Sequence, residues 1–329
     1  MIQAIAEAQA SLSEEPTAGI EDVITRLAER GRNYHDEVVP VSDVRMDQHS
    51  GELLVGKSEH YPLRPHALGQ LAVKLGIPAA YLRRCEPELR AHNVNRWLKE
   101  QEGSLLLRMD GDDVRAVLST RYRPFDNLDI ARCMKSGLRA DTGIRFEVSE
   151  TIMALQVVGR HDLGDENDPL NFGVGIVNSE VGAASLSFSS MVFRRICLNG
   201  MIFTTRETSY SRKHVGGVDL GAVVTEQMAT RSVDGNNMVS VFIRLKAVVI
   251  EEPAKVFDKI GERYELTQDQ REAITAAYGV EPGNHLYACI NAVTRAGNSE
   301  TLALESRLRL QEVGGRMLEA AGKGRRWLD

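Results

Sequence analysis

The residues best suited to binding chemistry lie between Glu180 and Asp219. Inside these two acids the segment holds one further carboxylate, Glu207, and many serine, threonine and asparagine side chains. Guanidinium, ammonium and hydroxyl groups together suit contacts with a phosphate backbone, and a tyrosine ring can stack on an unpaired base. The segment therefore predicts a nucleic-acid interface made of Arg194, Arg195, Arg206, Tyr210, Arg212, Lys213 and His214.

A second basic cluster lies earlier in the chain, where Tyr122 stands between Arg121 and Arg123 and follows Arg108 and Arg115. Tyr122 would serve as a stacking platform between two phosphate-binding arginines. A structural interpretation stays open for both clusters. The later segment would be an arginine-rich sheet face paired with the acidic residues 162–168, or a subunit interface. The earlier one would be an exposed strand end beside the core.

Signs of enzymatic chemistry are few. The chain has no GxxxxGK[ST], HExxH or GxSxG motif, and Gly173-Val-Gly175 lacks the third glycine of a dinucleotide fingerprint. His161 and its acidic neighbours lack the ligand ladder of a calcium loop. Cys197 and His214 could form a nucleophile pair, but a cysteine between Ile196 and Leu198 is more often a buried, inert thiol. We therefore expect no catalytic residue, no metal and no cofactor.

Composition limits the class of protein. The 329 residues are 43% hydrophobic and 26% charged, as in globular proteins, which excludes collagen-like and wholly disordered chains. The net charge of −6 means that binding to nucleic acid requires a local patch. No apolar run approaches the roughly 18 residues of a membrane span, and the first residues lack a secretion signal. The four cysteines are far apart, which favours a reducing cytoplasm.

Periodicity predicts an α+β fold: a central antiparallel sheet with a β-hairpin, at about 104–215, between N-terminal helices and a helical C-terminal third. We expect three regions, 1–103, 104–220 and 221–329. The expected hairpin has strands at 104–109 and 114–120, and the acidic stretch 162–169 is expected to be a loop between strands. Another short hairpin is expected from 38–41 and 53–55.

Residues 68–84 have the pattern of a helix–turn–helix, with Gly76 in the turn and Pro78 at the start of the second helix. One interpretation is a helix that reads DNA at 79–84. We favour a plain helical hairpin, because the sequence Pro-Ala-Ala-Tyr offers few side chains that read bases.

Three stretches together resemble a large bacterial family often described only as phage/plasmid-like protein, a domain of unknown function carried by phages and mobile elements. They are RAVLSTRYRPFDN at 115–127, GIVNSEVG at 175–182, and RRICLNG at 194–200 with the later RKH at 212–214. The resemblance covers roughly residues 50–300. It implies a remote kinship with Rad-type single-strand-annealing proteins, which form rings whose basic groove holds single-stranded DNA.

The residues and the resemblance together favour a non-enzymatic protein that binds single-stranded DNA and promotes strand annealing without ATP. Its expected setting is recombination in the cytoplasm of a bacterium or a phage-infected host cell. We expect a homo-oligomer, with a ring as one form, and no membrane contact. Two alternatives stay open. One is an enzyme or host-defence modulator with a nucleotide or small-molecule pocket near Asn178–Glu180 and Cys197–Asn199, and the other is a non-catalytic oligomeric scaffold.

Overall fold

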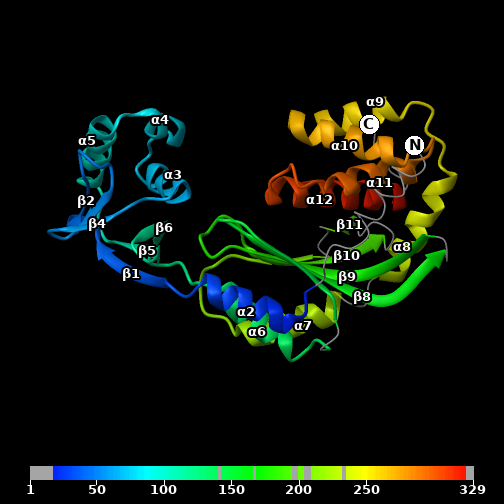
Figure 1. The fold of residues 1–329 in the computed structure, drawn as a ribbon, viewed down its shortest axis with the longest axis horizontal. Coiled ribbons are helices and arrows are strands. Elements are labelled where there is room, and N and C mark those ends of the chain that lie inside the picture. Colours follow the sequence, from blue (N-terminus) through cyan, green and yellow to red (C-terminus); the bar gives the residue numbers. More distant parts are fainter. Residues whose placement is uncertain are drawn as a thin grey trace.

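The computed structural model describes residues 18–139, 142–165, 168–194, 199–203, 209–231 and 235–323. Within these residues the strands form antiparallel sheets, and helices cover them (Figure 1). The predicted α+β class with a helical C-terminal third is confirmed. No helix among the described residues is long and apolar enough to cross a bilayer.

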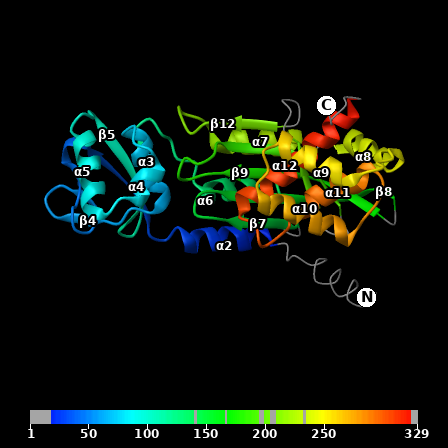
Figure 2. The same cartoon turned by 90° about the horizontal axis from the view of Figure 1, so that it is seen from above.

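Residues 34–119 form an N-terminal lobe at one end of the molecule (Figure 2). The predicted hairpin is confirmed as β5 (Ser104–Asp110) and β6 (Asp113–Ser119), with Gly111 in the turn at a φ of 57°. The hairpin pairs with β1 (Tyr34–Pro40) and not with the large sheet, so the strands of 104–215 belong to two sheets.

The expected hairpin of 38–41 with 53–55 is wrong. β1 pairs along its whole length with β5, which places Val39 in the lobe's main core. Residues 53–55 join a separate small sheet, whose strands are β2 (Val44–Met46), β3 (Leu53–Val55) and β4 (Glu59–Tyr61).

Helices of the lobe bury an apolar face against these strands. The helical hairpin predicted at 68–84 is present, with Gly76 in the turn at a φ of 69° that favours glycine. Leu71 and Leu82, one from each of its helices, have no exposed surface. The helices of the lobe are α3 (Pro65–Lys74), α4 (Ala79–Arg84) and α5 (Pro87–Leu98).

The large sheet has the strand order β11-β10-β9-β8-β7, and β12 pairs with β10 beside β11. The acidic stretch expected as a loop is mostly strand: Asp162 pairs with Asn171, and Asp165 with Asp168. Backbone pairing on a neighbouring strand outweighs the low strand propensity of aspartate and glycine. The strands are β7 (Ile144–Val148), β8 (Met153–Asp165), β9 (Asp168–Asn178), β10 (Leu186–Arg194), β11 (Asn199–Ile202) and β12 (Ser209–Arg212).

Helices cover both faces of this sheet (Figure 1). On one face, Leu155, Ile176 and Phe188 of the sheet form a core with helices α2 (Ile20–Arg30), α6 (Asn127–Lys135) and α7 (Leu220–Arg231). The other face is covered by α8 (Gly235–Arg244), α9 (Pro253–Arg263), α10 (Gln268–Val280), α11 (Leu286–Ala296) and α12 (Leu304–Gly322).

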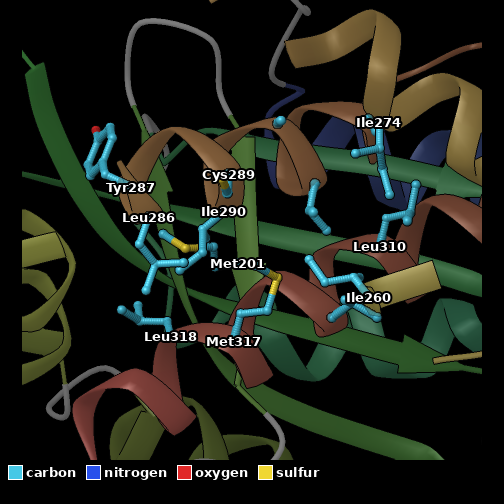
Figure 3. Packing of buried hydrophobic residues seen from close by; sticks show 14 of the residues in the cluster. Met201, Ile260, Ile274, Leu286, Tyr287, Cys289, Ile290, Leu310, Met317 and Leu318 are labelled. Carbon is cyan, nitrogen blue, oxygen red and sulfur yellow. The ribbon is translucent and has the colours of Figure 1, made fainter. Parts of the chain in front are cut away.

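The C-terminal helices form a core of their own around α11, which is buried along most of its length. Figure 3 shows Met201 of the sheet packed among side chains of α11 and α12. α10 begins with a capping box, in which Thr267 and Gln270 exchange hydrogen bonds. Cys289 is a buried free thiol in this core, and Cys85 and Cys133 are also free.

α12 lies unusually close to the sheet at Gly315. A Cβ atom built on Gly315 would stand 2.0 Å from the backbone oxygen of Ile202 in β11. A side chain at this position would collide with the backbone, which cannot rotate away as a side chain would. Glycine therefore sets the distance between α12 and the sheet.

We predict that Gly315→Ala lowers the free energy of unfolding by about 2 kcal/mol or more, because overpacking shifts the helix off the strand. Thermal or urea denaturation measures this. Gly279→Ala is the matched control, since a Cβ there meets nothing within 4 Å. It should stabilise α10 by up to about 1 kcal/mol through helix propensity. Equal stability of the two variants would contradict the close approach.

Candidate nucleic-acid interface

The connection between β9 and β10, here called the 178–182 turn, lies between the N-terminal lobe and the large sheet. Asn178 and Ser179 have no exposed surface, and Glu180 is 8% exposed. The Glu180 carboxylate accepts hydrogen bonds from Arg115 Nη2 and from the backbone N–H of Asn127, each at 2.9 Å. One carboxylate thus joins the lobe, the turn and the start of α6.

Arg108 supports the same turn from the neighbouring strand. Its Nη1 donates to the backbone oxygen of Glu180 at 2.8 Å, and its other nitrogens pair with Asp36 and Asp126 at 2.8 and 2.7 Å. Burial disfavours the charge on this guanidinium, but the two carboxylates outweigh that cost and raise the pKa of Arg108. Arg108 is therefore a structural cation, because its guanidinium is paired with groups of the protein itself.

Arg115 is 4% exposed and has fewer polar partners than Arg108. Its guanidinium carbon lies 3.5 Å from the centre of the Tyr34 ring, a cation–π contact. Nε and Nη1 have no hydrogen-bond partner among the described residues. Arg115 therefore depends on Glu180 as its ion-pair partner at 2.9 Å.

Tyr122 and His214 pack together beneath the turn. The Tyr122 hydroxyl donates to the backbone oxygen of Ser179 at 2.9 Å, and burial raises its pKa. The two rings are parallel within 4°, with centroids 5.0 Å apart. Because the Arg123 N–H donates to the His214 oxygen at 2.8 Å, residues 121–123 and 213–215 run side by side.

His214 is 4% exposed, and neither ring nitrogen has a hydrogen bond of good geometry to a described residue. Burial lowers the pKa of His214, and the positive charge of Arg108 lowers it further. The Arg123 backbone and the Asp126 carboxylate oppose this shift without cancelling it. His214 is therefore a neutral, buried stacking partner at neutral pH.

Arg194 is also interior, at the far end of β10, where it pairs with Asp168 and Glu281. Asp168 accepts a hydrogen bond from Tyr287 as well and pairs with Lys246 at 2.9 Å. Burial alone would raise the pKa of Asp168, but these partners lower it. The structural interpretation, an arginine paired with the acidic stretch, describes Arg194.

Some of the remaining predicted residues lie at or near the surface, and the others lie outside the described residues. Arg121, Arg123 and Lys213 are exposed, and Arg212 is half-buried with Nη2 3.3 Å from the Gly217 oxygen. Tyr210 is half-buried against Phe188, with ring centroids 6.3 Å apart. Arg195, Cys197 and Arg206 lie outside the described residues.

Four cations lie on these two adjacent segments, here together called the basic corner: Arg121, Arg123, Arg212 and Lys213. The segments are adjacent because 121–123 lies beside 213–215. Among the described residues none of the four has an ion-pair partner. A corner of this kind can contact phosphates with little rearrangement, since the buried Tyr122–His214 stack holds both segments.

Parts of the three stretches that carry the resemblance lie together, namely RYRPFDN, NSEVG and RKH, while residues 195–198 of RRICLNG lie outside the described residues. Polar residues of these stretches, Glu180 above all, hold the lobe on the large sheet. Sequence reasoning missed Glu180 as the central residue. A signal was available, because Glu180 is the lone acid between Asp168 and Glu207 and lies among apolar strands, where a carboxylate needs a partner.

No family model, curated protein or solved structure matches this chain. The resemblance to the phage/plasmid-like family thus stays a prediction. No group of His, Cys, Asp and Glu in the described part of the chain is arranged to hold a metal ion.

We predict that Glu180→Gln costs about 3–5 kcal/mol of stability, because it leaves the buried Arg115 guanidinium without a counter-charge. Urea denaturation measures the loss. Glu100→Gln is the matched control, since its partner Arg96 is 57% exposed and the pair lies on the surface. The control should change stability by about 1 kcal/mol or less. A similar small effect at both positions would contradict the central place of Glu180.

A second prediction concerns His214 and pH. Since its pKa is lower in the folded protein than the roughly 6.5 of an unfolded chain, the unfolded state takes up the proton first. The free energy of unfolding should therefore be highest above about pH 7 and fall as pH drops through the unfolded pKa.

His214→Phe keeps the ring stack on Tyr122 and removes the titrating group. Its unfolding free energy should fall less than that of the unaltered protein between neutral pH and mildly acidic pH. Denaturation of both proteins over the same pH series measures the difference. The other histidines contribute equally to both proteins, so their effect cancels in that difference. Parallel pH profiles would show that His214 does not titrate with folding.

Proposed function

We propose that this protein binds single-stranded DNA without catalysing a reaction, and that the basic corner contacts the phosphates. The observation that supports this most is the exposure of Arg121, Arg123 and Lys213 together, without described ion-pair partners, in a chain of net charge −6. Unpaired surface cations at one place give a local positive potential that attracts a polyanion.

Fewer residues are exposed and able to contact DNA than the sequence predicts. Arg108, Arg115, Arg194, Tyr122 and His214 are each 9% exposed or less and are held by partners or packing inside the protein. They position the corner or the sheet and do not reach a strand of DNA. Arg212 completes the corner, and Tyr210 offers one half-exposed ring on β12 for stacking.

Annealing and assembly are finer parts of the same proposal. Four cations contact only a short stretch of DNA, so a protein that holds long strands for pairing needs several copies of the corner. An ATP-independent mechanism fits the missing phosphate loop, because annealing needs charge neutralisation with exposed bases and no hydrolysis. Light scattering should then find species well above 36.4 kDa when single-stranded DNA is present.

We predict that Arg121→Gln with Lys213→Gln weakens binding to all sequences alike. Each lost phosphate contact removes about 0.7 from the slope of log affinity against log salt, so the pair should flatten it by about 1.4. Anisotropy of fluorescent oligonucleotides over a salt series measures both quantities. The changes should leave stability nearly unaltered, because exposed unpaired cations contribute little.

Arg45→Gln with Lys57→Gln is the matched control, since both residues are exposed on the small sheet of the N-terminal lobe. It makes the same change in net charge and should keep the unaltered salt slope. No binding of single strands by the unaltered protein, even at low salt, would remove the proposal. Equal loss in both double variants would assign the effect to net charge alone. Normal DNA binding with loss of the oligomer in the corner variant would favour the scaffold alternative.

A further inference from the structure

An open groove of about 530 Å³ lies on the N-terminal lobe and is lined by residues of α3, α4 and the end of β6. Its volume is in the range of about 300–1,000 Å³ that holds ligands in proteins. The basic corner does not contribute to it. Leu118 of the groove and Tyr122 beneath the corner both lie against Gly182, so the two surfaces are neighbours.

The floor of the groove is apolar. Val73, Ala79, Val117 and Leu118 line it, and Val73 is 76% exposed although it is a large aliphatic residue. Exposed apolar groups gathered beside a polar rim mark surfaces that bind another molecule.

The rim of the groove is basic and has no acid. Lys74 and Arg83 line it, and neither has an ion-pair partner among the described residues. The sequence between Glu59 and Glu86 contains no aspartate or glutamate, in a chain that is acidic overall. Charge complementarity therefore calls for an anionic occupant.

Gly69 lines the groove and leaves part of it open, because it has no side chain. It lies inside α3, where glycine costs about 1 kcal/mol relative to alanine. A Cβ at this position would meet nothing within 4 Å, so packing inside the protein does not require glycine here. The absence of a side chain leaves space for a chain that approaches from outside.

We propose that this groove binds an acidic peptide segment with apolar side chains, supplied by a partner protein. The apolar floor takes the apolar side chains, and Lys74 and Arg83 pair with the carboxylates. A single strand of DNA matches the rim equally well but offers the floor no aliphatic groups, and no Phe, Tyr or Trp ring lines the groove for its bases. The partner would dock beside the DNA-binding corner without covering it.

The test uses labelled short peptides and the full chain. One peptide alternates aspartate with leucine or phenylalanine, a second replaces the apolar residues by serine at the same charge, and a third replaces aspartate by lysine. Fluorescence anisotropy should show binding of the first peptide at least about tenfold tighter than of the others, a difference of about 1.4 kcal/mol. An unlabelled oligonucleotide should not displace it.

Gly69→Glu should abolish this binding, because it fills the groove and adds a negative charge. Gly279→Glu is the matched control, since that helical glycine also has open space around it and lies far along the chain in α10. Lys74→Gln with Arg83→Gln should weaken peptide binding about tenfold, a loss of about 1.4 kcal/mol that two exposed ion pairs of up to about 1 kcal/mol each can supply. Neither change should alter the salt slope of DNA binding.

Several results would overturn the proposal. They are no binding of the first peptide, equal binding of the serine peptide, and unchanged binding by Gly69→Glu when circular dichroism shows a folded protein. If Gly69→Glu unfolds the protein, the Lys74 and Arg83 double variant decides alone. Displacement by the oligonucleotide, with DNA binding weakened by the groove variants, would assign the groove to nucleic acid.

Discussion

The buried ion pair between Glu180 and Arg115, at 2.9 Å, is the charged contact that joins the N-terminal lobe to the large sheet. It links a turn of the large sheet to the hairpin of the N-terminal lobe, and the same carboxylate accepts the N–H that begins α6. Two charges inside a protein are costly to desolvate, and further hydrogen bonds to the charged groups offset part of that cost. The Asn127 N–H supplies one of them, to the other oxygen of the Glu180 carboxylate, and Arg108 holds the backbone oxygen of Glu180 beside it.

Whether an arginine is buried or exposed depends on whether a carboxylate lies opposite it. Arg108, Arg115 and Arg194 face carboxylates across strands or turns, and burial strengthens their attraction to those partners. Arg121 and Arg123 lie at the corner after β6, where no described carboxylate pairs with them. A basic stretch of sequence therefore separates into interior ion pairs and exposed cations. Only the exposed cations are available to an anionic ligand.

The corner and the groove offer different chemistry although they are neighbours. The corner combines cations with polar backbone at the end of β12, which suits a phosphate chain. The groove combines cations with aliphatic side chains such as Val73 and Leu118, which suits a peptide. Both are held by the same junction, because Gln70 of α3 donates to the oxygen of Val181 at 2.6 Å. Both surfaces are thus positioned by contacts with the 178–182 turn.

Local sequence patterns determined much of this protein. Alternating apolar residues around Asp110-Gly111 specify the hairpin of β5 and β6, the Thr267–Gln270 capping box begins α10, and helical periodicity marks the C-terminal third. These features depend on neighbours in sequence, so pattern is sufficient. Only the tertiary structure decided that β1 pairs with β5, that Glu180 receives Arg115, and which arginines stay exposed. Such contacts join residues that are far apart in the chain. The sequence around an arginine does not show whether a distant carboxylate will pair with it in the interior or whether it will stay in water.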